Sequence, residues 1–336
     1  MSAIIHGGDI QKAMQLASES GFDAGKADDW LDLSTGINPN PYPISDISPS
    51  HWHRLPQKSD TDALRDAALT YYGAPSSNHI MPAPGSSILI NMLPTLLDAQ
   101  PISIVAPTYG DHATAWERGG HTIKQIGALE MSDPSGITIL VNPNNPDGTL
   151  YDSETLKAQA RLHGDAGGIL IVDEAFGDCV PHHSAVPLTG EHNVIVLKSM
   201  GKFFGLAGMR LGFAIARPDI CARLSAHLGP WALSGPALSL GLKALQDTKW
   251  HEQTRGGLKA ASSKLNHLLH NCGLERVGHT DLFTLIENKK AGSLFERLLK
   301  NKIYVRRFDY NPHWLRIGLP DSDENYSRLQ QAIIVE

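Results

Sequence analysis

The stretch "SMGKFFGLAGMRLGF", residues 199–213, follows an apolar run over 193–197 and decides the fold. It surrounds Lys202 with glycines and places Arg210 eight residues further on. A solvent-exposed helix face would carry other charges and few glycines. A lysine that follows a buried strand lies instead near the carboxyl end of that strand, where open parallel sheets bind their ligands. We therefore expect Lys202 to act in a ligand crevice.

Short apolar runs typical of buried strands recur through the middle of the chain. Amphipathic stretches such as 153–162 lie between several of them, and this alternation predicts a parallel sheet in an α/β domain. The expected strands are 102–106, 137–141, 168–172, 194–197 and 211–215. After Pro236 we expect one long helix over 237–269 and then a smaller α+β unit with apolar runs at 282–286, 303–305 and 315–317.

Composition narrows the class of protein. The chain has 336 residues, 41% hydrophobic and 19% charged, which is typical of a globular protein of roughly two domains. A net charge of −6 without a basic block argues against nucleic acid as a partner. The start lacks the layout of a signal peptide, and no stretch approaches the ~20 apolar residues that cross a bilayer. With three widely spaced cysteines and no disulfide framework, we expect a cytoplasmic protein that does not bind membranes.

Polar residues follow four of the expected strands. Because the carboxyl ends of parallel strands meet at one edge of a sheet, these residues should converge on one crevice. They would supply an aromatic ring, an amide, a carboxylate and a lysine. The segments are "PTYG" at 107–110, "NPNNPDG" at 142–148, "DEAFGD" at 173–178 and "KSMGK" at 198–202.

Nucleotide and metal sites do not fit these segments. A phosphate-binding P-loop needs Ser or Thr after its lysine, whereas Phe203 follows Lys202. A dinucleotide fingerprint, H-E-x-x-H and paired C-x-x-C motifs are all missing from the sequence. Cys179 with His182 and His183 is the nearest candidate cluster, and we interpret it as an ordinary loop. We expect no metal.

A lysine in a crevice with an acid suits a different cofactor. A desolvated lysine becomes nucleophilic and forms a Schiff base with a carbonyl. Pyridoxal 5'-phosphate (PLP) needs such a lysine, an acid beside its pyridinium nitrogen and donors for its phosphate. The sequence offers all three, so we expect PLP as the cofactor.

The pattern S-x-x-K-x-x-G-x-x-G-x-R-x-G from Ser199, in order with "NPNNPDG" and "VDEAF", resembles the fold-type I PLP enzymes of the class I/II aminotransferase superfamily over nearly the whole chain. The resemblance implies a large domain with a mostly parallel central sheet and a smaller α+β domain. It implies an N-terminal arm over 1–45 that joins the small domain and closes over the site, a PLP-binding domain over 46–240 and a small domain over 241–336. Sites in this superfamily usually form at a dimer interface, which implies a homodimer.

The resemblance also assigns roles. Lys202 would form the Schiff base and move protons at the substrate α-carbon, while Lys198, a competitor, lacks the motif spacing. Asp173 would pair with the pyridinium nitrogen, Asn145 would bond the ring hydroxyl, and Tyr109 would stack on the ring. Arg316 in "WLRIGLP" would bind the substrate carboxylate. The cofactor phosphate would be held by Ser86, Ser87, Ser199 and Arg210.

The N-terminal segments "HGGDI" (6–10), "DLSTGINPNPYP" (32–43), "HRLP" (53–56) and "YYGAP" (71–75) resemble the threonine-phosphate decarboxylase family of cobalamin biosynthesis. That family is close to the histidinol-phosphate aminotransferases. The resemblance implies decarboxylation of L-threonine O-3-phosphate to (R)-1-amino-2-propanol O-2-phosphate. Arg306 is the first candidate for the substrate phosphate, with His6 and Lys302 behind it. The resemblance implies that the backbone around Gly36 and Asn38 contacts the substrate carboxylate.

Two positions depart from the usual aminotransferase pattern. Phe176 stands where a tyrosine usually bonds the ring hydroxyl, and Leu55 stands where the tyrosine of R-Y-P reaches the phosphate on the partner subunit. Neither side chain can donate that hydrogen bond. Two alternatives stay open at this point: a histidinol-phosphate-like aminotransferase that uses 2-oxoglutarate, and a cofactor-free binding or scaffold protein on the same fold.

Overall fold

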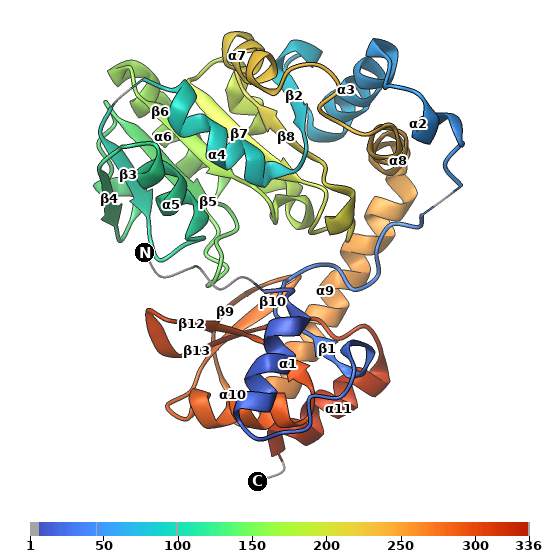
Figure 1. Cartoon of the computed structure of the whole chain (residues 1–336). Helices are drawn as coiled ribbons and strands as arrows, with labels where there is room; N and C mark the ends of the chain where they lie inside the picture. The colour runs from blue at the N-terminus through green and yellow to red at the C-terminus, as the bar shows by residue number, and fades with distance from the viewer. Residues whose placement is uncertain (1–6, 45, 99, 335–336) are drawn as a thin grey trace. The chain divides into compact units, whose positions relative to one another are not determined.

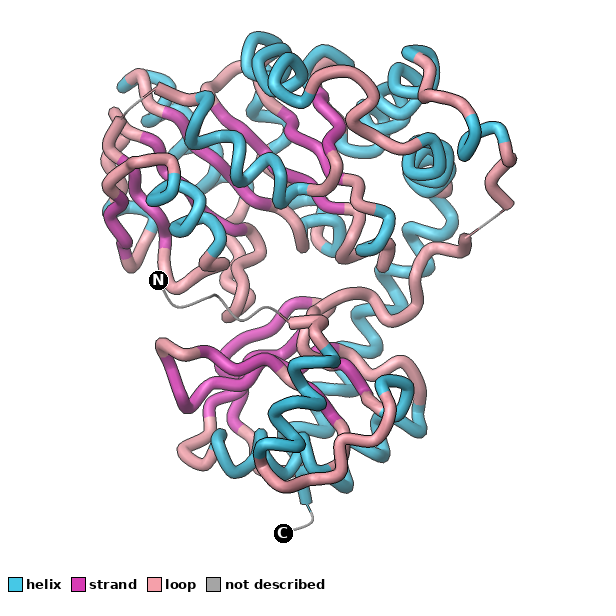
Figure 2. Tube along the Cα trace, in the orientation of Figure 1, coloured by secondary structure: helices cyan, strands magenta, loops and turns pink. Residues whose placement is uncertain are grey.

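The computed structural model describes residues 7–44, 46–98 and 100–334. Contacts within the chain divide these residues into two compact units, which are described separately. The small unit comprises residues up to 40, 146–148 and 253 onwards, and the large unit comprises 41–145 and 149–252. Figure 1 labels their helices and strands, and Figure 2 separates helix from strand by colour.

A seven-stranded sheet forms the centre of the large unit, with strand order β2-β8-β7-β6-β5-β3-β4. All neighbouring strands pair in parallel except those next to β8, which is antiparallel to both β2 and β7. The mostly parallel sheet expected from the sequence is therefore confirmed. The strands are β2 (Ile80–Ala83), β3 (Ile102–Val105), β4 (Ile123–Ile126), β5 (Ile137–Val141), β6 (Ile169–Asp173), β7 (Val194–Ser199) and β8 (Gly212–Ile215).

Helices cover this sheet, and α4 crosses one of its faces (Figure 1). The core on that face joins alternate strand residues such as Ile139 and Ile171 to Leu93 of α4, Trp116 of α5 and Leu224 of α7. This alternation follows from the pleat, which turns every second side chain to the same face. The helices of this unit are α2 (Ser50–His53), α3 (Lys58–Tyr72), α4 (Ser86–Leu96), α5 (Asp111–Arg118), α6 (Ser153–Ala166), α7 (Pro218–Leu228) and α8 (Gly235–Gln246).

The small unit has an antiparallel sheet in the order β12-β13-β10-β9 and a separate parallel pair, β1 with β11. The expected α+β character of this part is thus confirmed. Its strands are β1 (Leu31–Asp32), β9 (Glu275–Thr280), β10 (Phe283–Glu287), β11 (Ile303–Tyr304), β12 (Arg306–Phe308) and β13 (Asn311–Gly318). Its helices are α1 (Ile10–Glu19), α10 (Ala291–Lys300) and α11 (Asp323–Ile334).

The expectation of one helix over 237–269 was wrong, because the structure has α8 and then α9 (Thr248–Asn271). Asp247 separates them with φ −85° and ψ 75°, outside the helical region. Its carboxylate accepts the backbone N–H of Trp250 at 3.0 Å, so it caps the first turn of α9 in the way that aspartate favours.

The N-terminal part combines an irregular segment with a helix. Residues 34–49 contain no helix or strand where the structure describes them. However, α1 precedes them, started by Asp9, whose side chain accepts the N–H of Lys12 at 2.9 Å. Ala13 and Ala17 bury one face of this helix. Among the described residues, no helix combines the length and apolar character needed to cross a bilayer.

Candidate active site

A pocket in the large unit opens beside the ends of several sheet strands. Its walls come from the start of α4 and from the segments after β3, β5, β6 and β7. The structure therefore brings together all eight residues expected at the cofactor. They are Ser86, Ser87, Tyr109, Asn145, Asp173, Ser199, Lys202 and Arg210.

One end of the pocket is built to accept an anion. Ser86 and Ser87 are the first residues of α4, where backbone N–H groups have no partner within the helix. Arg210 has a left-handed backbone with φ 53°, and its guanidinium packs against Gly85 so closely that any Cβ there would overlap with it. A Cβ on Gly212 would lie 2.6 Å from the Ser86 nitrogen. The two glycines thus keep the helix N-terminus and the guanidinium close together.

Asp173, the last residue of β6, is a buried carboxylate with fixed geometry. One oxygen lies 2.9 Å from Nε2 of His112, and the other accepts the N–H of Ala175 at 2.9 Å. Both side chains are almost fully buried, which makes their interaction strong and their orientation rigid. The sequence reasoning missed His112. The one indication in the sequence is that His112 follows Tyr109 by three residues, at the start of α5. Its partner Asp173 lies 61 positions further along the chain, so no local pattern links the two residues.

The structure separates the two candidate lysines. Lys198 is buried and forms an ion pair with Glu174 at 2.5 Å between Nζ and Oε2. Lys202 lines the pocket, and its Nζ lies 5.5 Å from the centre of the Phe176 ring. Lys198 is therefore held by a carboxylate outside the pocket lining, whereas Lys202 stands in the pocket.

Hydrogen bonds hold the two segments that carry Tyr109 and Asn145, the residues expected at the cofactor ring. The hydroxyl of Tyr109 donates to the carboxylate of Asp111 at 2.6 Å. Asn145 is preceded by Asn144, whose side chain accepts from the Thr108 hydroxyl at 2.6 Å and donates to the Pro107 carbonyl at 3.0 Å. These bonds tie the segment after β5 to the segment after β3, so the two walls of the pocket are fixed relative to each other.

The small unit carries the two arginines expected to bind the substrate. Arg306 of β12 and Arg316 of β13 are direct cross-strand partners. Arg316 is only 5% exposed and donates to the carbonyls of Ser34 and Thr35 at 2.8 and 3.2 Å. Like charges placed opposite each other in a sheet are destabilising. Two cations in register therefore indicate a place that an anion would stabilise.

The remaining substrate candidates differ in their surroundings. Gly36 has φ 69°, a conformation that favours glycine, and Asn38 is buried and accepts the N–H of Asn40 at 2.9 Å. Lys302 lies 3.1 Å from Asp23 and 3.7 Å from Asp29, so its charge is already compensated. His6 lies outside the described residues.

The chemistry of the pocket fits PLP. An amine for the aldehyde, a rigid carboxylate for the pyridinium nitrogen and an anion-binding end for the phosphate occur in one cavity. The glycines at 85 and 212 allow the Arg210 guanidinium and the start of α4 to lie close together at this anion-binding end. These three features are what the cofactor requires of a protein.

Comparison with known proteins gives the class. The model of the family "Aminotransferase class I and II" matches residues 48–333, and the chain belongs to this family. PLP is its cofactor, as expected.

Individual relatives show which enzymes of this family the chain resembles. A threonine-phosphate decarboxylase of Sinorhizobium is 42% identical, and the alignment covers 99% of this chain and 98% of that relative. A threonine-phosphate decarboxylase of Pseudomonas aeruginosa is 38% identical, covering 98% and 97%. The structure of histidinol-phosphate aminotransferase from Sinorhizobium meliloti in complex with pyridoxal-5'-phosphate has a TM-score of 0.78 at 18% identity, covering 99% of this chain and 98% of its own. At that identity the last likeness establishes the fold, which confirms the fold-type I expectation.

Proposed function

We propose that this protein is a PLP-dependent decarboxylase that converts L-threonine O-3-phosphate to (R)-1-amino-2-propanol O-2-phosphate in cobalamin biosynthesis. The observation that carries the proposal is the pairing of Arg306 with Arg316 on adjacent strands, which suits a substrate with both a carboxylate and a phosphate. The two relatives above, at 42% and 38% identity, bear the name of this activity. A cytoplasmic location fits the three free cysteines.

In this proposal the large unit holds the cofactor. Lys202 would hold its aldehyde, and Asp173, oriented by His112, would keep the pyridinium nitrogen protonated. Tyr109 would stack on the ring and Asn145 would bond its hydroxyl. The phosphate would lie against the N-terminus of α4. Its donors would be Ser86, Ser87, Ser199 and Arg210.

Bound PLP withdraws electrons from whichever bond at the substrate α-carbon stands perpendicular to its ring. The protein then decides the reaction by orienting the substrate. Arg316 would bind the carboxylate and Arg306 the substrate phosphate, so that the bond to the carboxylate is the one held perpendicular. Gly36 and Asn38 would add contacts from the N-terminal arm, and His6 is proposed only from the resemblance. After CO₂ leaves, the Lys202 amine would return a proton to the α-carbon.

A histidinol-phosphate-like aminotransferase is the second candidate, because its substrate also carries a phosphate. The buried Phe176 favours the decarboxylase, because it lacks the hydroxyl that usually bonds the cofactor ring in aminotransferases. A direct comparison tests the choice. Purified protein loaded with PLP is given threonine phosphate, or histidinol phosphate with 2-oxoglutarate, and CO₂ and glutamate are measured. Formation of glutamate without CO₂ would refute the decarboxylase.

The cofactor-free scaffold that the sequence left open does not agree with the family of the chain, whose cofactor is PLP. Lys202 and Asp173 are both present in a pocket that fits PLP, and these residues would serve no purpose in a scaffold. A visible absorbance that borohydride removes, and that Lys202→Ala never shows, would exclude this alternative.

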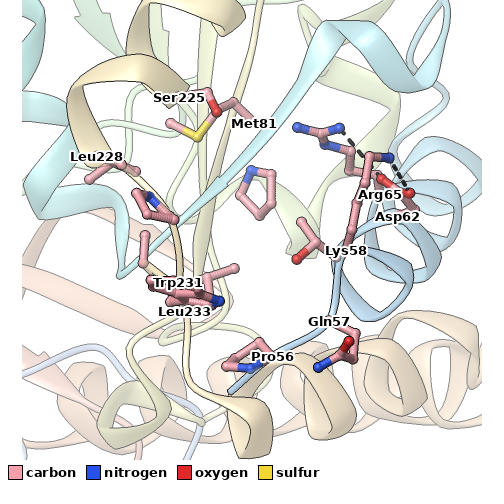
Figure 3. A pocket seen from close by; sticks show the side chains of 15 residues that line it. Pro56, Gln57, Lys58, Asp62, Arg65, Met81, Ser225, Leu228, Trp231 and Leu233 are labelled. Carbon is pink, nitrogen blue, oxygen red and sulfur yellow. Dashed lines mark hydrogen bonds and ion pairs between the residues drawn. The ribbon is translucent and has the colours of Figure 1, made fainter.

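We also propose that the protein is a homodimer. Several large hydrophobic side chains of the large unit are highly exposed, among them Trp52 at 67%, Leu55 at 59% and Trp231 at 60%. Trp231 and Pro56 line one pocket with Leu228 and Leu233 (Figure 3). Trp231 has a left-handed backbone with φ 57°, a strained conformation for a bulky residue. Exposed apolar side chains that lie together often belong to a protein interface, which supports the proposal for the surface around Trp231.

The homodimer can be tested independently of the reaction. Sedimentation of the PLP-loaded protein should give a mass twice that of the chain, and Trp231→Glu should lower it to one chain at the same concentration. Lys157→Glu changes an exposed residue of α6 in the same unit and should leave the mass unchanged. A wild-type protein that sediments as a monomer at micromolar concentration would contradict the proposal.

A further inference from the structure

A buried ion pair lies next to the pocket but takes no part in lining it. Glu174 and Lys198 are about 1% and 2% exposed, with 2.5 Å between their charged atoms. The same carboxylate accepts the Ser184 hydroxyl at 2.7 Å and the N–H of Ala185 at 2.6 Å. Lys198 Nζ also lies 5.0 Å from the centre of the Tyr72 ring. This geometry satisfies both charges away from water.

The pair sits directly behind residues of the pocket. Glu174 follows Asp173 at the end of β6, and Lys198 precedes Ser199 at the end of β7. Since side chains alternate along a strand, Asp173 and Ser199 point to one face while Glu174 and Lys198 point to the other. The N–H of Glu174 bonds the carbonyl of Leu197 at 2.9 Å and extends the ladder between the strands. The ion pair therefore fixes the relative positions of two strand ends that carry pocket residues.

The Glu174 carboxylate also closes the segment that carries Phe176. This segment begins at Glu174 and returns to the same carboxylate through Ser184 and Ala185. A Cβ on Gly177 would lie 2.9 Å from the Cβ of Glu174 and 3.4 Å from Lys198 Nζ, so the segment packs tightly on the pair. Phe176, one residue before Gly177, faces Lys202 in the pocket.

We propose that Glu174 and Lys198 are positioning residues, whose buried ion pair holds Asp173, Phe176 and Ser199 in the geometry that binds PLP. A contribution to stability alone does not explain the pair, because replacing a buried ion pair by uncharged residues of similar size is often neutral or stabilising. A positioning role predicts a different result: the protein without the pair stays folded but binds its cofactor less well. The inference rests on the proposed PLP site and is independent of which reaction the site performs.

The test uses the double variant Glu174→Gln with Lys198→Met, which removes both charges and keeps the side-chain sizes. The full-length apoprotein is titrated with PLP and followed by its visible absorbance, and its thermal midpoint is measured without cofactor. We expect the apoprotein midpoint to stay within a few degrees of wild type, while the dissociation constant of PLP rises about tenfold. The pH at which the absorbance of the bound cofactor changes should shift as well.

The matched control is an ion pair on the surface of the same unit, Arg161 with Asp165, at 3.8 Å and more than three-quarters exposed. Arg161→Met with Asp165→Gln should leave the affinity for PLP and its absorbance unchanged. The single variant Lys198→Arg, which keeps the positive charge beside Glu174, should retain most of the wild-type affinity for PLP. The proposal would be overturned if the double variant folds and keeps the wild-type affinity for PLP and the wild-type absorbance. It would also be overturned if the double variant fails to fold and Lys198→Arg fails to fold as well. The titration with PLP contains no substrate, so its result does not depend on the reaction. If a separate assay with threonine phosphate shows no CO₂ release, the proposed function is refuted but the role of the ion pair is not.

Discussion

The two units of the chain present their functional residues in different ways. The large unit collects Asn145, Asp173 and Lys202 from segments that follow separate strands of one sheet. The small unit instead sets Arg306 and Arg316 side by side within a single antiparallel sheet. The first arrangement shapes a cavity with fixed walls, while the second concentrates positive charge on a strand pair.

This difference suggests a division of labour. In the large unit the carboxylate of Asp173 and the anion-binding end of the pocket are held by backbone and buried side chains, which suits a permanently bound cofactor. In the small unit, two arginines supply charged hydrogen-bond donors in a fixed planar fork, which suits recognition of an anionic substrate. Changes in the large unit should therefore alter cofactor absorbance and kcat, and changes in the small unit should alter KM and substrate choice.

The largest effect is expected from Lys202→Ala. Because Lys202 is the amine proposed to hold the aldehyde and to return the proton, its loss should lower kcat by on the order of 10⁴-fold. The absorbance that borohydride removes should disappear at the same time. Rates of CO₂ release and absorbance spectra check both effects.

Lys198→Met serves as the contrast for Lys202→Ala, since it removes the neighbouring lysine outside the pocket. Its bound PLP should still be reduced onto the protein by borohydride, at Lys202. Labelling at position 198 of the wild-type protein, found by peptide mapping after reduction, would contradict the assignment.

Arg316→Gln should have the next largest effect and should separate the two units. Arg316 is almost buried and bound to the carbonyls of Ser34 and Thr35, so its loss should lower kcat/KM about 10² to 10³-fold. PLP affinity should stay at the wild-type value, because the change lies in the small unit. Equal losses in PLP affinity and in kcat/KM would break the proposed division of labour.

The sequence predicts the large unit better than the small one, for physical reasons. The run Ile137–Val141 is buried on both faces, so its apolar pattern marks the strand unambiguously, and the first polar residues after such strands mark the pocket. The pairing of Arg306 with Arg316 depends on strand register, which a hairpin turn sets and no local pattern reveals. His112 was missed because its partner lies 61 positions away. The break at Asp247 was missed because one capping residue interrupts an otherwise continuous helical pattern.

Arg306→Gln tests whether Arg306, the second arginine of the small unit, recognises the substrate phosphate. Loss of one charged hydrogen-bond donor to the phosphate should raise KM for threonine phosphate about ten- to a hundredfold. We expect L-threonine, which lacks the phosphate, to be turned over slowly by the wild-type protein and at the same rate by the variant. Arg307→Gln is the control, since that side chain stacks on Phe295, with 4.8 Å between its Cζ and the ring centre. If turnover of L-threonine falls in proportion, Arg306 does not recognise the phosphate.

The smallest effect is expected from Phe176→Tyr, which tests how far the large unit sets the reaction. Phe176 is 3% exposed and its ring centre lies 5.5 Å from Lys202 Nζ, so a new hydroxyl would enter a nearly dry environment beside the cofactor ring. A hydrogen bond to the ring hydroxyl should shift the pH midpoint of the cofactor absorbance by less than about one unit. If Phe176 helps to exclude transamination, the variant should also form more keto acid per CO₂ released. An unchanged midpoint with an unchanged product ratio would mean that the orientation given by Arg306 and Arg316 alone selects the bond that breaks.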